Sequence, residues 1–269
     1  MGDFPGFLDF TKPGSGYIDD NRYHPFIRFW KRYGRHFTRL ICVNALYALI
    51  TMPVFVWLMS LINAAAMDMG IGAISVMGTV LLSVVINWPG ALLAALLVVS
   101  ILLTGPATAA LSYATLNCAW DRPGMFWAAF WSARKENWKQ ALPIGIVDVL
   151  VCFGTLYYLV DGSVVFGVYA TAVKIVWCVL GLIYAMVRVY LYPIMVTVEL
   201  PLGTLIKNSL ILSILNPGRP LAVILIAGFL CLTCVVADLV VVPLFLYSFV
   251  AFSAAFLTQP VIEKYLIRA

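Results

Sequence analysis

Two ionisable side chains, Asp148 and Lys174, lie within long apolar segments of this chain. A charge inside a membrane is costly, so such residues are usually paired or take part in function. Asp148 lies about two turns into the apolar segment 141–160, and Lys174 lies near the middle of the segment 164–187. The helical rise puts the two residues at depths that differ by roughly 10 Å, which a lysine side chain can partly bridge. We therefore predict an ion pair between adjacent helices, which either holds the helices together or belongs to a polar path.

The other polar residues of the chain form no catalytic constellation. Both histidines, His24 and His36, lie in the N-terminal segment without other metal-ligating residues, and no nucleophile motif or phosphate-binding loop occurs. Cys231 and Cys234 form a CxxC inside an apolar run, without a second pair or a nearby histidine, which indicates small packing residues. The sequence therefore predicts no enzyme activity, no cofactor and no metal site.

Aromatic and basic residues are mixed in two segments beside the apolar ones. The stretch 25–37, PFIRFWKRYGRHF, is typical of an amphipathic foot on an anionic membrane surface, or of ordinary positive flanking of a span. Residues 121–140 carry aromatic side chains at helical spacing, which predicts an amphipathic helix along the inner membrane interface. The alternative is a docking surface for a cytoplasmic partner. Its candidate residues are Trp127, Trp131, Arg134, Lys135, Lys139 and, in segment 199–220, Lys207. Nucleic-acid binding is not expected, because a bilayer already explains the pattern.

Small and polar residues in the first two apolar segments indicate close helix packing. Gly105 and Ala109 are four residues apart and lie on one helix face, where small side chains let two backbones approach. Pro106 introduces a kink that loosens backbone hydrogen bonds. We interpret these residues, together with Asn44, as helix-packing positions, and a substrate site near Gly105 is the alternative.

The elements that position these residues require a bilayer. Of the 269 residues, 63% are hydrophobic and 11% are charged, and the mean hydropathy is +1.00, whereas soluble domains are about 45–50% apolar. Segments of about 20 apolar residues, the length of a membrane-spanning helix, occupy 40–63, 91–111, 141–160 and 164–187, and the stretch 221–257 is long enough for two helices that turn at Asp238. The sequence predicts one all-α membrane domain over residues 1–269, with about six spans. It consists of a foot at 1–39, a helical bundle at 40–258 and a tail at 259–269.

The short apolar segment 71–87 leaves the number of spans open between six and seven. With six spans and a cytoplasmic N-terminus, all 17 Lys and Arg residues except Lys174 fall in cytoplasmic segments, as the positive-inside rule requires. Seven spans would place several basic loops on the outer face. We therefore predict that both termini are cytoplasmic, and that residues 71–87 form a re-entrant or interfacial helix on the outer side.

Four motifs follow one another along nearly the whole chain. They are KPGSGY at 12–17 with FIRFWKRYGRHFTRLICVNALYALITMPV at 26–54, TGPATAALSYA at 104–114, FWSARKENWKQALPIG at 130–145, and YPIMVTVELPLGTLIKNSLILSILN at 192–216. This series resembles the YesL family of bacterial membrane proteins, whose biochemical role is not established. The resemblance implies a multi-pass protein of the bacterial cell membrane, encoded beside carbohydrate importers of the ABC type. It implies no catalytic residues.

Two functional hypotheses follow. The first is a non-enzymatic accessory membrane protein associated with a carbohydrate ABC importer. Its partners would be the lipid bilayer and either importer subunits or a second copy of the chain, with segments 121–140 and 199–220 as contact surfaces. The second is a small stand-alone transporter or channel, with a polar path through Asn44, Asp148, Lys174 and Arg188. The small number of polar residues in the apolar segments favours the first hypothesis.

Overall fold

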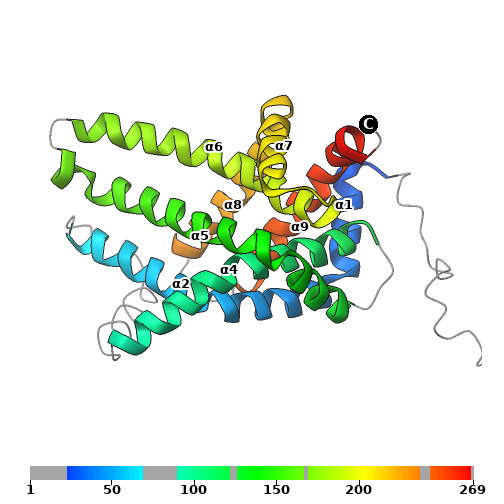
Figure 1. The fold of residues 1–269 in the computed structure, drawn as a ribbon, viewed down its shortest axis with the longest axis horizontal. Coiled ribbons are helices and arrows are strands. Elements are labelled where there is room, and N and C mark those ends of the chain that lie inside the picture. Colours follow the sequence, from blue (N-terminus) through cyan, green and yellow to red (C-terminus); the bar gives the residue numbers. More distant parts are fainter. Residues whose placement is uncertain (1–22, 69–89, 122–125, 167–168, 237–242, 268–269) are drawn as a thin grey trace, which may run out of the picture.

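The computed structural model describes residues 23–68, 90–121, 126–166, 169–236 and 243–267, and these residues form a bundle of helices without strands (Figure 1). The all-α prediction is therefore confirmed. The helices are α1 (Pro25–Arg35), α2 (Phe37–Asp68), α4 (Gly90–Ala119), α5 (Phe126–Phe166), α6 (Ala170–Thr197), α7 (Leu202–Leu215), α8 (Gly218–Val236), α9 (Pro243–Ile262) and the π-helix η3 (Glu263–Ile267). The predicted outer helix at 71–87 lies outside the described residues.

The longest helix, α5, corrects one prediction about the inner loop. The amphipathic segment within 121–140 was expected to be a separate interfacial helix, but from Phe126 it is the first part of α5. The residues around the expected break, ENWKQAL, are mostly good helix formers, and Pro143 does not end the helix. With 41 residues, α5 is about 62 Å long, roughly twice the hydrocarbon core of a bilayer. Its amphipathic part therefore extends the apolar part beyond a single span.

Four helices of the described chain are long and apolar enough to cross a membrane: 37–54, 95–119, 171–197 and 246–267. Helices α7 and α8 meet at an angle of 92° and together give a fifth candidate. The predicted segment 141–160 lies in α5, where the side chains are described only as far as residue 155. Six spans therefore stay a prediction. Segment 199–220, expected as a cytoplasmic loop, instead contains all of helix α7.

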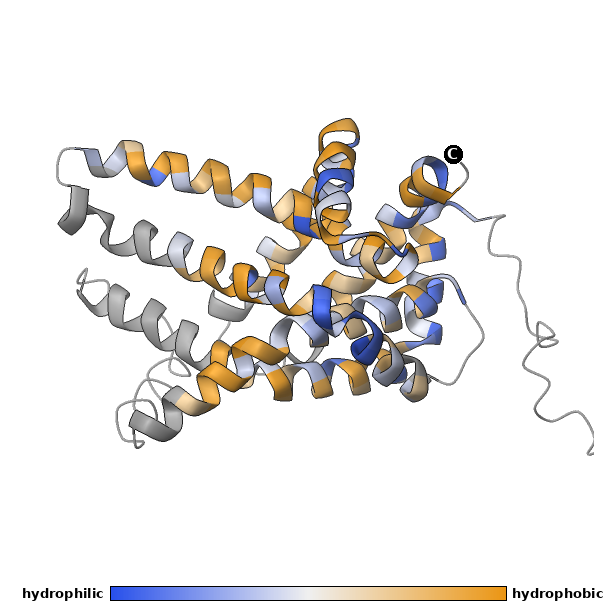
Figure 2. Ribbon diagram, viewed as in Figure 1, coloured by the Kyte–Doolittle hydropathy of each residue, from blue (hydrophilic) through white to orange (hydrophobic). Residues whose placement is uncertain are grey.

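The outward faces of several helices are apolar, as expected for a protein surrounded by lipid. Large hydrophobic side chains are exposed on α6, α7 and α8, among them Ile175, Leu180, Ile214, Leu225 and Phe229. Figure 2 shows that hydrophilic residues gather mainly at the end of the bundle where α1 and the C-terminus lie. These long apolar helices are compatible with a membrane protein.

Helix α1 is fixed to the end of α4 by polar contacts around Asp121. Arg35 Nη1 and His36 Nε2 lie 2.7 and 2.6 Å from the two carboxylate oxygens of Asp121, and Arg32 Nη1 donates to the carbonyl oxygen of Ala119 at 2.7 Å. Burial raises the pKa of Asp121, but the hydrogen bond from His36 and the charges of Arg35 and Arg32 outweigh it and hold that pKa below its ordinary value. The N-terminal foot is therefore part of the packed fold from α1 onwards.

The C-terminal residues expected as a tail also belong to the bundle. Helix α9 runs to Ile262, and both Val261 and Ile262 are buried in the core. Phe256 of α9 packs edge-on against Phe29 of α1, with ring centroids 5.4 Å apart. Helix α1 and the C-terminus consequently lie at the same end of the bundle (Figure 1).

Candidate functional site

Asp148 of α5 is the centre of a polar cluster inside the bundle. The hydroxyls of Tyr184 and Tyr192 donate to its Oδ1 and Oδ2 at 2.6 and 2.7 Å, and Arg188 Nε lies 2.9 Å from Oδ1. The side chain of Asp148 is 6% exposed. A carboxylate buried in this way needs both a counter-charge and hydrogen bonds to both oxygens, and here it has them.

The three partners of Asp148 come from one face of α6. Tyr184, Arg188 and Tyr192 are spaced four residues apart, so they stand one above another on the helix. Asp148 lies 18 residues before the end of α5 at Phe166, and Arg188 lies 18 residues after the start of α6 at Ala170. Because neighbouring antiparallel helices run away from their connection at the same rise per residue, the two charges lie at the same level.

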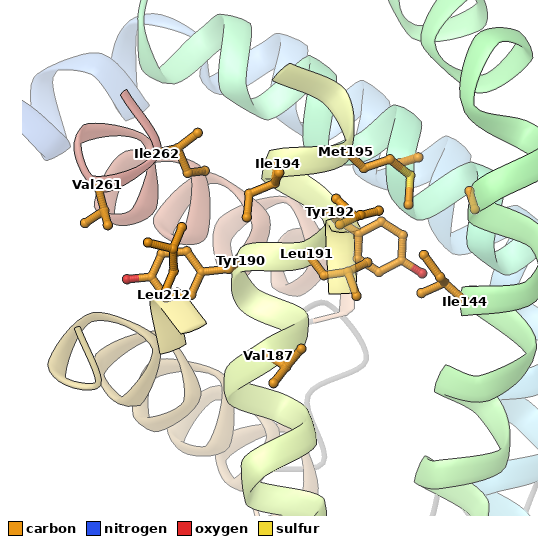
Figure 3. Packing of buried hydrophobic residues seen from close by; sticks show 13 residues of the cluster. Ile144, Val187, Tyr190, Leu191, Tyr192, Ile194, Met195, Leu212, Val261 and Ile262 are labelled. Atoms are coloured by element: carbon orange, nitrogen blue, oxygen red, sulfur yellow. The ribbon is translucent and has the colours of Figure 1, made fainter. Parts of the chain in front are cut away.

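Packing on both sides of α6 holds this face in place. Tyr192 projects from α6 towards α5, whereas Tyr190 projects from the opposite side, next to Leu212 of α7 (Figure 3). Tyr190 and Tyr192 are 0% and 2% exposed. The rotation of α6 about its axis is thereby fixed, which directs Arg188 and Tyr184 towards α5.

The predicted partner of Asp148, Lys174, is replaced by Arg188. Lys174 lies in the second turn of α6, 14 residues before Arg188, or about 21 Å along the helix axis. The prediction was wrong because it began the helix at residue 164, whereas α6 begins at Ala170 and Lys174 therefore lies near its end. The spacing of Tyr184, Arg188 and Tyr192 is the sequence signal that could have identified the correct partner.

A cavity of about 610 Å³ lies beside the Asp148–Arg188 pair. Most of its wall is apolar, and helices far apart in the sequence contribute to it. Its lining includes Tyr47 and Thr51 of α2, Thr104 of α4, Asp148, Cys152 and Thr155 of α5, Cys178, Tyr184, Ala185 and Arg188 of α6, Ile224 of α8, and Tyr247 of α9. The volume is in the range of pockets that hold small organic molecules.

The polar groups in this wall differ in how fully they are bonded. Thr51 and Thr104 donate to carbonyl oxygens of their own helices, at 2.9 and 2.7 Å. Tyr47 hydrogen-bonds Thr108 at 3.0 Å and lies beside Arg188. Arg188, by contrast, contacts Asp148 through Nε, and its side chain is 41% exposed while lining the cavity. Arg188 is therefore the charged group that faces the cavity.

Two predicted packing positions build the scaffold around the site. A Cβ atom on Gly105 would lie 2.7 Å from the carbonyl carbon of Ala141 and 3.0 Å from Cα of Gly145, so α4 and α5 touch backbone to backbone. Asn44, 0% exposed, accepts a hydrogen bond of 2.7 Å from the backbone N–H of Ser248 and so connects α2 to α9.

The other two packing positions lie beside Gly105 on α4. Ala109 is fully buried in the main core cluster, and Pro106 lies within α4 without ending it. Gly145, the glycine that faces Gly105, was missed in the sequence, although Ala141 lies four positions before it and repeats the small-residue spacing of Gly105 and Ala109.

The candidate docking residues lie apart from the cavity. Trp127 and Trp131 are 49% and 45% exposed at the start of α5, and Arg134 lies over the ring of Trp131 at 5.3 Å. Lys135 and Lys139 are also exposed on α5, whereas Lys207 is exposed on α7. The described chain thus presents an aromatic and basic stretch of α5, with Lys207 on a different helix.

The described residues hold no group of three or more His, Cys, Asp or Glu side chains placed to bind a metal ion. Asp148 already accepts from three donors, one of them the charged Arg188, and these contacts stabilise its ionised form and make it a weak general base.

Residues 40–159 match the model of a family described as "Protein of unknown function, DUF624". The matched part covers most of α2, all of α4 and most of α5, and it includes Asp148 but not Arg188. Neither the curated proteins nor the solved structures contain a match to this chain.

Proposed function

We propose that this protein is a multi-pass membrane protein that binds a small solute in the cavity beside Arg188 and moves it across the bilayer. The observation that carries the proposal is the cavity itself, about 610 Å³ with a charged pair in a mostly apolar wall. Charged residues inside membrane bundles typically mark substrate or ion pathways. Sites of this kind near the middle of the membrane, between helices, are usual in transporters.

The direction of the bundle in the membrane follows from its charges. Helix α1, which carries Arg32 and Arg35, and the start of α5 lie at the end that also holds the C-terminus. The positive-inside rule assigns that end to the cytoplasm. The four motifs along the chain support placement in the YesL family, and with it a location in a bacterial cell membrane.

Flux into liposomes tests the proposed transport. Purified protein is reconstituted, and uptake of glucose, alanine and benzenesulfonate is compared with uptake into protein-free vesicles. At least one solute is expected to enter faster with the protein present. Ala185→Trp, which fills the cavity, is expected to abolish the difference, and Val179→Trp, on the exposed face of the same helix, is expected to preserve it. Equal uptake with and without protein for all three solutes would contradict transport.

The exposed tryptophans at the start of α5 support a second function, that of an accessory subunit of a carbohydrate ABC importer. Aromatic and arginine side chains are enriched where proteins bind one another, and Trp127, Trp131 and Arg134 combine both kinds. Purification of the full chain from native membranes in mild detergent tests this role. Importer subunits are expected to co-purify, to be lost from the Trp127→Ser/Trp131→Ser variant, and to be retained by Tyr265→Ser, which changes an exposed aromatic residue on η3. Absence of every importer subunit would count against it.

A further inference from the structure

The guanidinium of Arg188 is only partly used by its neighbours. Arginine carries five N–H donors in a planar fork that matches a carboxylate with two parallel hydrogen bonds. Asp148 does not make that double contact here: Arg188 contacts Oδ1 through Nε, and Oδ2 accepts from the hydroxyl of Tyr192. Tyr47, beside Arg188, can accept one further hydrogen bond. Among the described contacts, terminal N–H groups of Arg188 therefore remain for a ligand in the cavity.

Asp148 does not compete for those remaining donors. Its two oxygens are held by Tyr184 and Tyr192 as well as by Arg188 Nε, so three donors share its negative charge. The ring of Tyr192 also lies 5.5 Å from the centre of the Arg188 guanidinium and covers one side of it. The terminal N–H groups of Arg188 on the cavity side can thus donate to a hydrogen-bond acceptor on a molecule bound in the cavity.

The wall of the cavity restricts the rest of the ligand. A sugar needs acceptors as well as donors around its hydroxyls, but the one carboxylate in the described lining, Asp148, already accepts from Tyr184, Tyr192 and Arg188. The lining contains no Asn, Gln or Glu among the described residues. Thr51 and Thr104 donate their hydroxyl hydrogens within their own helices, so each offers a sugar an acceptor but no donor. Most hydroxyls of a bound sugar would lose hydrogen bonds to water without replacing them, which is unfavourable.

Building on the proposed solute-binding function, we propose that the cavity binds an anion with one carboxylate and an apolar body, the carboxylate paired with the terminal nitrogens of Arg188. The carboxylate makes charge-assisted, two-pronged hydrogen bonds to the fork. The apolar body contacts the surrounding wall, which includes Leu182 and Ile224. A cavity of about 610 Å³ accommodates a body of the size of a phenylpropyl group.

Binding of matched compounds to the purified, full-length protein in lipid nanodiscs tests the assignment. The probes are 3-phenylpropionate, its primary amide 3-phenylpropanamide, and glucose, measured by calorimetry. The acid and the amide share the apolar body and differ in charge. We expect the Kd of the acid to be at least about tenfold lower than that of the amide, and glucose not to bind.

Substitutions of the two basic residues of α6 test whether Arg188 is the group that binds the carboxylate of the acid. Arg188→Lys keeps the charge but lacks the fork, and it is expected to raise the Kd of 3-phenylpropionate about tenfold. Lys174→Met removes a cation from the same helix outside the cavity lining, and it is expected to leave that Kd unchanged. The comparison of acid with amide on the unmodified protein decides the assignment even if Arg188→Lys does not fold.

The outcomes separate this assignment from the proposed function. If the amide binds as tightly as the acid, or glucose binds more tightly, the anion assignment is wrong while a solute-binding cavity stands. If none of the three compounds binds, the assignment is also wrong, and the flux measurement with Ala185→Trp decides on transport independently. Equal loss of acid binding in Arg188→Lys and Lys174→Met would likewise contradict a contact with Arg188.

Discussion

Gly105 of α4 and Gly145 of α5 face each other with no side chain between them, and a Cβ on Gly105 would lie 3.0 Å from Cα of Gly145. Asp148 follows Gly145 by three residues, less than one helical turn. The short distance between α4 and α5 at this contact therefore sets where the carboxylate of Asp148 lies relative to α6. Close approach of helices through small residues is a common device in membrane proteins.

The crossing predicts that Gly105→Ala destabilises the protein strongly. The added methyl would overlap the carbonyl group of Ala141, so the two backbones must separate, at a cost of about 3 kcal/mol or more. Gly228→Ala is the matched control, because this glycine of α8 has open space where a Cβ would be, and alanine favours helix by about 1 kcal/mol. Thermal unfolding in detergent should show a lower Tm for the first variant and an equal or higher Tm for the second. A similar Tm for both variants would contradict the backbone contact.

The ion pair predicts that Asp148 is coupled energetically to Arg188 and not to Lys174. Asp148→Asn alone leaves the Arg188 charge without its partner, at a cost below the about 3–5 kcal/mol of a fully buried pair because the Arg188 side chain is 41% exposed. The double variant Asp148→Asn/Arg188→Met is expected to lose less stability than the sum of the two single variants. The losses of unfolding free energy caused by Asp148→Asn and by Lys174→Met should instead add to within about 0.5 kcal/mol, since the two sites are far apart. A double-mutant cycle by denaturant unfolding measures both couplings, and simple additivity with Arg188 would refute the pairing.

The two tyrosines that hydrogen-bond to Asp148 should contribute unequally to the stability of the protein. Each donates to a charged group, and such hydrogen bonds contribute about 1.5–3 kcal/mol. Tyr192 is 2% exposed, so Tyr192→Phe leaves Oδ2 of Asp148 without access to water and should fall at the upper end of that range. Tyr184 is half-buried, so water can replace its hydroxyl and Tyr184→Phe should cost less. Unfolding of the two variants under the same conditions gives the order, and a larger loss for Tyr184→Phe would contradict this geometry.

Asp121 predicts a loss of stability in acid. Its pKa is lower in the folded protein than the ordinary value of 3.8, because His36 and the nearby arginines favour the charged form. A carboxylate with a lowered folded pKa stabilises the protein at pH above its unfolded pKa, and that contribution disappears as the pH falls through the folded value. Stability measured from pH 6 to pH 2 should therefore decrease below about pH 4, and Asp121→Asn should show a smaller decrease. An identical pH profile for Asp121→Asn would show that this carboxylate is not responsible.

The fold class was predictable because a bilayer imposes helical segments of nearly fixed length. The long apolar segments, Gly105 and Ala109 at one helix face, and the burial of Asn44 could be read from residue type and spacing alone. The end of the amphipathic segment was not predictable, since helix formers continue from Trp138 through Ala141 and no signal marks where interface and span meet. The segment that contains α7 was assigned to a cytoplasmic loop from the count of basic residues, which included Lys207 and Arg219, and this count does not indicate whether a loop is helical.

The sequence by itself determined that the charge of Asp148 had to be accommodated inside an apolar bundle, and it placed Lys174 there too while counting Arg188 with the cytoplasmic residues. Only the tertiary structure decided which charges meet. The connection between α5 and α6 lies six residues later than predicted at both of its ends, at Phe166 and Ala170 instead of 160 and 164. The two shifts, about 9 Å each, together move the level of Asp148 along α6 from near Lys174 to Arg188. The cavity likewise depends on side chains from helices that are distant in the chain, whose relative rotation is set by packing rather than by any local pattern.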